Sequence, residues 1–148
     1  MRVAIDTNVL VYAEGYGDEP RCLRAGALIA DLNASDVVLP AQVLGELFNV
    51  LTKKVGRSAQ AGRDAVLSWS DAFEVADSTR DSITAACDLV ATHPLQFWDA
   101  LILSVAAQQK CRVLVTEDLT HGFTWQGLTV VNPFSETQHP LLVQLLAK

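Results

Sequence analysis

The sequence predicts an α/β fold, a three-layer α/β/α domain built around a mainly parallel sheet. Short apolar runs bounded by turn residues alternate along the chain with longer segments whose apolar residues recur at helical spacing. The run from Arg112 to Thr116 has an uninterrupted apolar centre, which is typical of a parallel strand covered by helices on both faces. We therefore expect helices on either side of one sheet.

Each element follows from the same pattern. The expected strands span residues 3–5, 37–39, 73–76, 112–116 and 128–131. The expected helices span residues 9–13, 21–33, 41–53, 59–70, 80–91 and 97–109. Pro40 closes the second strand, Gly56 ends the third helix, and Ser58 and either Ser78 or Thr79 are the expected caps of the helices that follow them.

Length and composition indicate one globular domain over residues 1–148, with residues 134–148 as a C-terminal tail or a short helix. Half of the residues are hydrophobic and 19% are charged, which excludes a disordered chain. The chain starts with a strand pattern instead of a leader, and no apolar run is long enough to span a membrane. The three cysteines are far apart, as in a protein with reduced thiols, so we expect a cytoplasmic location.

The charge balance is acidic, with 17 acidic against 11 basic residues and a net charge of −6. A protein that simply coats nucleic acid is usually basic, so that class is disfavoured. An acidic balance fits a site that gathers carboxylates around divalent cations, and it also fits a basic protein partner. Charge alone does not choose between these alternatives.

Four carboxylates stand at positions where the predicted fold places ligands. Asp6 and Asp118 each follow a predicted strand, and open parallel sheets bind ligands beyond the carboxyl ends of their strands. On a helical wheel, Glu46 lies about 40° beyond the edge of its helix's apolar arc. Asp99 falls inside the apolar arc and in the first turn of its helix, where the helix dipole favours negative charge.

Each acid has a plainer interpretation when it is taken alone. Asp6 and Asp118 can be turn or helix-capping residues, and Glu46 can be a solvated residue at the rim. Asp99 is the hardest to explain in this way, because a carboxylate on an apolar face needs a partner. Converging carboxylates suit Mg²⁺ or Mn²⁺, which can activate water near a phosphodiester. Their mutual repulsion should raise their pKa values when no metal is bound.

Four segments, taken in order, resemble the conserved motifs of PIN domains. They are Ile5-Asp6-Thr7-Asn8-Val9-Leu10, Val43-Leu44-Gly45-Glu46-Leu47, Phe97-Trp98-Asp99-Ala100-Leu101-Ile102 and Val113-Leu114-Val115-Thr116-Glu117-Asp118. The segment from Gly127 to Phe134 is similar to toxins of the VapC type, so the resemblance covers residues 1 to about 134. One departure is Gln96, which stands where related toxins often have a small residue.

The resemblance implies a three-layer PIN-like fold and a Mg²⁺- or Mn²⁺-dependent endoribonuclease. It also implies a toxin that acts on RNA, is held by a cognate antitoxin and often forms a homodimer. On that model the metals are carried by Asp6, Glu46, Asp99 and Asp118. Asn8 and Thr116 would not bind the metals themselves but would orient the ligand side chains or water. Glu117 adjoins Asp118 and is ambiguous, because alternation along an extended segment points it the other way.

Two alternative functions can be tested against the residues that each would require. A phosphotransferase of the haloacid dehalogenase type needs a second aspartate two residues after the first, and this chain has Asn8 there. A catalytically inactive PIN-like module that binds RNA or a partner would be expected to lose one or more of the acids. All four are present, which favours an enzyme.

RNA must also be held near the carboxylates. Candidate RNA contacts are Lys53, Lys54, Arg57, Arg112 and Trp125. For the two lysines, a favourable charge at the end of a helix is an alternative role. We expect Trp125 to lie in a loop, where it could stack on a base, and Trp98 to lie in the core.

Overall fold

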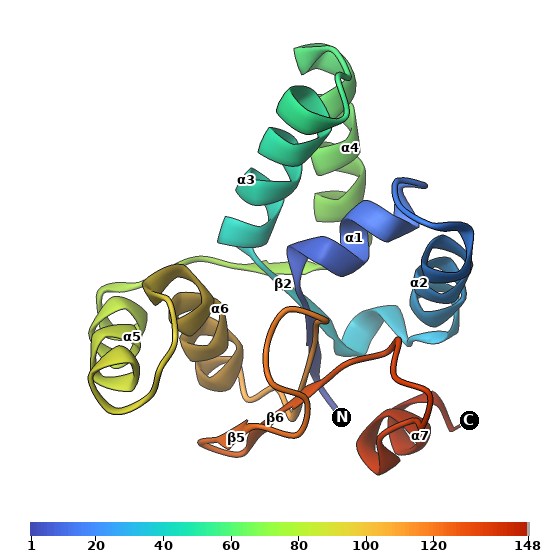
Figure 1. Cartoon of the computed structure of the whole chain (residues 1–148). Helices are drawn as coiled ribbons and strands as arrows, with labels where there is room; N and C mark the ends of the chain where they lie inside the picture. The colour runs from blue at the N-terminus through green and yellow to red at the C-terminus, as the bar shows by residue number, and fades with distance from the viewer. Residues whose placement is uncertain (148) are drawn as a thin grey trace.

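A single sheet organises residues 1–147, the part of the chain that the computed structural model describes (Figure 1). Its strands are β1 (Val3–Ile5), β2 (Val37–Pro40), β3 (Glu74–Ala76), β4 (Val113–Val115), β5 (Thr124–Trp125) and β6 (Leu128–Val131). They lie in the order β3-β2-β1-β4-β6-β5, and every pairing is parallel except that of β5 with β6. The predicted mainly parallel sheet is therefore confirmed.

Six of the seven α-helices that the structure describes in residues 1–147 pack as pairs around this sheet, and α7 (Pro140–Leu146) follows at the C-terminal end. The paired helices are α1 (Thr7–Ala13), α2 (Glu19–Asp31), α3 (Ala41–Asn49), α4 (Ala59–Ala72), α5 (Arg80–Thr92) and α6 (Phe97–Gln108). Figure 1 shows α5 and α6 on one side of the sheet, α1 and α2 on the other, and α3 and α4 as a projecting hairpin. This arrangement confirms the three-layer α/β/α class.

The core explains why the central strands are apolar throughout. All residues of β1 and β4 are completely buried, because helices cover both faces of the sheet. Ile5 lies opposite Val115 in the parallel register. The two strands therefore end at the same level, and the residues that follow them meet at one edge of the sheet.

Two helices begin two residues earlier than predicted because of their caps. Asp6 accepts a hydrogen bond from the backbone N–H of Thr7, so α1 starts at Thr7. Asp18 caps α2 in the same way through the backbone N–H of Arg21, and this helix includes Pro20, which precedes the predicted start at residue 21. Proline is compatible with a first helical turn, where its missing N–H has no partner to lose.

The predicted helix over residues 41–53 is α3 followed by a wider π turn, η2 (Val50–Lys54). A short 3₁₀ helix, η1 (Ala34–Asp36), and the two-residue strand β5 were not predicted. The C-terminal segment contains the helix α7, one of its two predicted states. Lys148, the last residue of the predicted domain, lies outside the described residues.

The expectation that Trp98 belongs to the core is wrong. Helix α6 is buried from Ala100 to Ala106, but Trp98 is 63% exposed. Trp98 lies in the first turn of the helix, before its buried stretch, and the burial of the later turns does not extend to it.

Within residues 1–147, no helix combines the length and apolar character needed to cross a membrane.

Candidate active site

Asp6 and Thr116 meet where β1 and β4 end. The Thr116 hydroxyl donates to one carboxylate oxygen of Asp6 at 2.8 Å, and the Thr7 N–H donates to the other at 2.7 Å. Asp6 is only 5% exposed, and Thr116 is completely buried. Asp6 thus caps α1, as its plainer interpretation proposed, and also lies inside a polar cluster.

Glu46 reaches the same edge from α3. Its carboxylate accepts hydrogen bonds from the Thr7 hydroxyl at 3.1 Å and from the Gln42 amide, one turn earlier on the helix. Thr7 therefore links Asp6 to Glu46 through its backbone and its side chain. Glu46 is half-buried, which agrees with its expected place at the rim of the apolar face.

Asn8 connects Asp6 to Asp118. Its amide nitrogen donates to Thr116 and to Asp118, each at 3.0 Å, and lies 3.5 Å from Asp6. Asp118 is exposed, and its backbone N–H donates to the Thr116 hydroxyl at 3.2 Å. Asn8 and Thr116 therefore lie behind the acids, in contact with both Asp6 and Asp118.

Asp99 joins the group from the first turn of α6, where it is half-buried. Burial raises its pKa, and the nearby negative charges of Glu46 and Asp118 raise it further. The backbone carbonyl of the preceding residue, Trp98, accepts from Gln42 at 3.1 Å, and Gln42 also holds Glu46. This contact ties α6 to α3 beside the acids.

Burial also raises the pKa of Asp6, to about 6. Hydrogen bonds from Thr116 and Thr7 oppose this shift, whereas the charges of Glu46 and Asp99 add to it. Burial is therefore the main cause of both shifts, and the neighbouring carboxylates add to it in the direction that the sequence predicted for clustered acids without a metal.

The donor set fits a hard divalent cation. Carboxylate oxygens are the ligands that Mg²⁺ and Mn²⁺ prefer. Burial is the main cause of the raised pKa of Asp6, and a bound cation would offset both the burial of its charge and the smaller effect of the neighbouring carboxylates. The amide oxygen of Gln42, beside Glu46, is buried without a hydrogen-bond partner. As the side chains stand, no three Asp, Glu, His or Cys residues within 1–147 are close enough to hold a metal. The carboxylates of Asp6, Glu46 and Asp118 instead accept hydrogen bonds from neighbouring donors.

A pocket of about 290 Å³ opens beside the acids. It is lined by Thr7, Asn8, Val11, Tyr12, Glu46, Val50, Lys54 and Asp118. In a continuous α-helix, Lys54 would lie about 80° around the axis from Glu46. The π turn η2 rotates the chain less per residue, and Lys54 lines the same pocket as Glu46.

The other candidate RNA contacts lie in different surroundings. Lys53 is exposed next to Lys54. Arg57 is half-buried and donates to the Tyr16 hydroxyl at 2.9 Å and to Glu14 at 3.3 Å. Its charge is therefore already paired within the protein, and it is not a free cation.

Arg112 and Trp125 do not join the acids either. Arg112 precedes β4, so the length of that strand, about 10 Å, separates it from the edge that carries Asp118. Trp125 belongs to β5, paired with Leu128, and is half-buried, which corrects its expected place in a loop.

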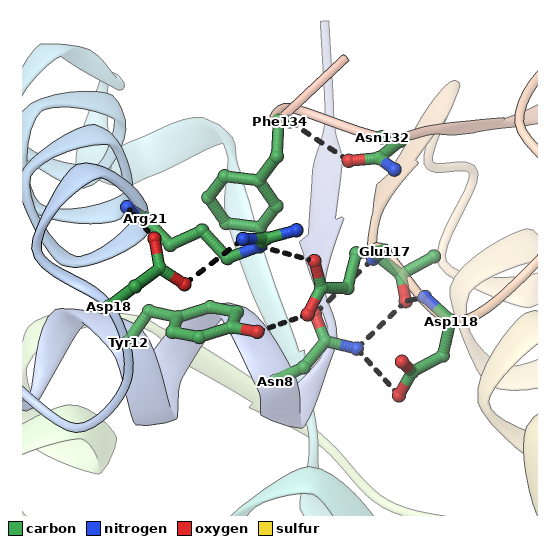
Figure 2. Close-up of polar contacts among 9 residues, drawn as sticks. Asn8, Tyr12, Asp18, Arg21, Glu117, Asp118, Asn132 and Phe134 are labelled. Carbon is green, nitrogen blue, oxygen red and sulfur yellow. Dashed lines mark hydrogen bonds and ion pairs between the residues drawn. The ribbon is translucent and has the colours of Figure 1, made fainter.

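Sequence reasoning named Asn8 and Thr116 but missed the other side chains that hold the acidic residues in place. Gln42 could have been found, because it lies four residues before Glu46 and therefore on the same helical face. Tyr12 and Arg21 both bind Glu117, whose carboxylate points away from Asp118 (Figure 2). No local pattern connects these two residues to Glu117, which is about a hundred positions away.

Comparison with known proteins adds a family match and several similar structures. The family model described as the PIN domain matches residues 3–121. Curated protein sequences give no significant match.

Three of the similar solved structures come from bacterial toxin systems. Mycobacterium tuberculosis VapC20, described as a sarcin-ricin loop cleaving toxin, has a TM-score of 0.65 and 22% identity over 76% of this chain and 86% of its own. A toxin–antitoxin complex from Klebsiella pneumoniae has a TM-score of 0.67 and 20% identity over 89% and 98%. Rickettsia felis VapBC2, bound to a promoter DNA fragment, has a TM-score of 0.64 and 18% identity over 88% and 97%.

Proposed function

The chain belongs to the PIN domain family, and on that basis we propose that it is a metal-dependent endoribonuclease, the toxin of a toxin–antitoxin pair. One observation carries this proposal most strongly. Carboxylates from two helices and from the segments that follow two strands converge at one edge of the sheet, where the pKa of Asp6 is raised to about 6. A buried carboxylate beside like charges is costly for a fold and useful for binding a cation.

In the proposed reaction, a water oxygen bonds to the phosphorus of an RNA phosphodiester. The bond from phosphorus to the leaving nucleoside oxygen breaks, and that oxygen takes up a proton. Asp6, Glu46, Asp99 and Asp118 would hold Mg²⁺ or Mn²⁺, which when bound supplies water activation and neutralises negative charge.

The remaining polar residues orient the carboxylates. Thr116 and Asn8 fix Asp6 and Asp118 through hydrogen bonds of 2.8 and 3.0 Å. Thr7 fixes Glu46 in the same way. Lys54, in the pocket, would bind a phosphate of the RNA, with Lys53 next to it.

Cleavage of a labelled structured RNA tests the proposal. Purified protein with Mn²⁺ should cut the RNA, EDTA should stop the reaction, and Asp6→Asn or Asp99→Asn should abolish it without unfolding the chain. Asp88→Asn removes an equally charged but exposed side chain on α5 and is the matched control. Wild-type cutting rates in both site variants would refute the catalytic assignment, whereas RNA binding without any cutting would indicate the inactive module.

Two further parts of the proposal concern partners. Several similar structures are toxin–antitoxin complexes, which supports a cognate antitoxin for this chain. Where a small reading frame adjoins its gene, co-expression with that frame should yield a stable complex in which cutting is suppressed. Light scattering of the free chain tests the proposed homodimer, and a monomeric mass at micromolar concentration would refute it.

A further inference from the structure

The segment that carries Asp118 lies outside regular secondary structure. Residues 116–123 follow β4 without forming a helix or a strand. A reacting group must be held to within a fraction of an ångström, and an irregular segment does not hold its side chains in place by itself. Backbone hydrogen bonds to β6 fix its two ends, from the Thr116 N–H to the Val131 carbonyl at 3.1 Å and from the Gly122 N–H to the Val130 carbonyl at 2.8 Å. Between these ends, side-chain contacts must hold Glu117 and Asp118 in place.

Glu117 provides such contacts. One of its carboxylate oxygens accepts from the Tyr12 hydroxyl, and the other accepts from Nε of Arg21 at 3.0 Å. Figure 2 shows the carboxylate turned toward these two residues and away from that of Asp118. We call Tyr12, Arg21 and Glu117 the Glu117 bracket. The carboxylate of Glu117 faces α1 and α2 and not the other acids, so Glu117 is not oriented as a metal ligand.

Arg21 is itself held on several sides. Its guanidinium pairs with Asp18 at 3.0 Å and lies over the ring of Phe134, 5.8 Å from the centroid. The Phe134 ring also meets Tyr12 edge-on at 5.2 Å, and its backbone N–H donates to Asn132 at 2.9 Å (Figure 2). The bracket is thus anchored to α1, α2 and the segment after β6.

The bracket is connected to the acids through Asn8. The backbone N–H of Glu117 donates to the amide oxygen of Asn8 at 3.3 Å. This contact determines which end of the Asn8 amide carries the oxygen. The nitrogen is then left to donate to Asp118 and Thr116, each at 3.0 Å. If Glu117 moved, the amide oxygen of Asn8 would lose this donor, and the amide would no longer be held in this orientation.

We propose that Tyr12, Arg21 and Glu117 are positioning residues that orient Asn8 and Asp118 for catalysis. The inference rests on the proposed nuclease function and assigns to Glu117 a role different from that of its neighbour Asp118. A partly exposed ion pair adds little to the stability of a fold, so loss of the bracket should affect the site far more than the fold.

Substitutions at Arg21 and Tyr12 test the bracket without touching the acids. Arg21→Gln and Tyr12→Phe should each lower kcat about 10- to 100-fold, the usual effect of losing a residue that orients a ligand, with KM for RNA little changed. Melting temperatures should stay within about 3 °C of wild type. Arg21→Lys keeps the charge and should recover part of the lost rate. The matched control is Arg24→Gln, because Arg24 lies one turn further along α2 and donates to the Pro133 carbonyl instead of Glu117.

Two measurements are independent of turnover. Mn²⁺ titration followed by electron paramagnetic resonance, without RNA, should give a dissociation constant about 10- to 100-fold weaker in Arg21→Gln and in Glu117→Gln. In the metal-free protein, the Asn8 side-chain amide resonances should move toward those of a free asparagine in both variants. The double variant Tyr12→Phe/Glu117→Gln should lower kcat by less than the product of the two single fold-losses, because both substitutions disrupt the same group of contacts.

The outcomes separate the possible roles. Raised KM with unchanged kcat in Arg21→Gln would make Arg21 an RNA contact and overturn the inference. Complete loss of Mn²⁺ binding in Glu117→Gln, equal to that in Asp118→Asn, would make Glu117 a ligand and also overturn it. Unchanged kcat and Mn²⁺ binding in all bracket variants, with an active wild type, would refute the bracket alone. A wild type that neither binds Mn²⁺ nor cuts RNA would refute this inference together with the proposed function.

Discussion

Replacing the buried carboxylate of Asp6 by a neutral amide should stabilise the metal-free protein. Burial raises the pKa of Asp6 from 3.8 to about 6, so the folded state holds its proton more tightly than the unfolded state. Below pH 3.8 both states are protonated and the charge costs nothing. As the pH rises from 3.8 through 6, the stability is progressively lost, because the unfolded chain ionises first.

The size of this effect follows from the pKa. A shift of this size corresponds to about 3 kcal/mol of free energy of unfolding above pH 7, and about half of that at pH 5. For a chain of this length, 3 kcal/mol corresponds to a gain of about 6–12 °C in melting temperature. Asn keeps the shape of the side chain, and its amide oxygen can still accept from Thr116 or Thr7.

Urea unfolding in EDTA at pH 5 and pH 8 measures the difference between Asp6→Asn and wild type. We expect the variant to be the more stable at both values, with the larger gain at pH 8. Asp88→Asn, on the exposed face of α5, should show no comparable gain. Equal stability of Asp6→Asn and wild type at pH 8, or a gain that does not change with pH, would refute the reasoning.

Three further predictions follow from packing and charge. A methyl group at Gly62 would lie 2.8 Å from Cγ2 of Thr52, so Gly62→Ala should lower the free energy of unfolding by about 1–3 kcal/mol, whereas Gly45→Ala, which meets open space, should lower it not at all. Trp98→Ala should change the free energy of unfolding, measured with urea, by less than about 1 kcal/mol. A loss of about 3–5 kcal/mol would instead indicate that Trp98 is a core residue. Because the proton on Asp6 competes with the metal, the Mn²⁺ dissociation constant should rise about tenfold per pH unit below pH 6, and a constant value between pH 5 and 7 would contradict the proposed ligand.

The positions of the acids were predictable because they depend on simple and general geometry. Strands that end at the same level bring Asp6 next to Thr116, and the observed register places Ile5 opposite Val115. The 100° rotation per residue placed Glu46 at a rim and Asp99 on an inward face. Such rules need only the element boundaries to be right to within a residue or two.

Apart from Asn8 and Thr116, the contacts that support the site were less predictable, because the partners are distant in sequence. Arg57 contacts Glu14 across 43 residues, and Arg21 contacts Glu117 across 96. The π turn was not predictable for a different reason, since no residue between Val50 and Lys54 marks a change of helical pitch. It nevertheless decides which lysine lines the pocket with Glu46.

Pairing of the arginines has a consequence for how RNA could approach the site. Arg57 is neutralised by Glu14, and Arg21 by Asp18 and Glu117. Within residues 1–147, Lys53 and Lys54 form no ion pair, so these two lysines remain as exposed cations near the pocket. Two positive charges do not outweigh four carboxylates. A phosphate that reached the metal-free site would therefore meet net negative charge, and a divalent cation would be needed to make the approach favourable.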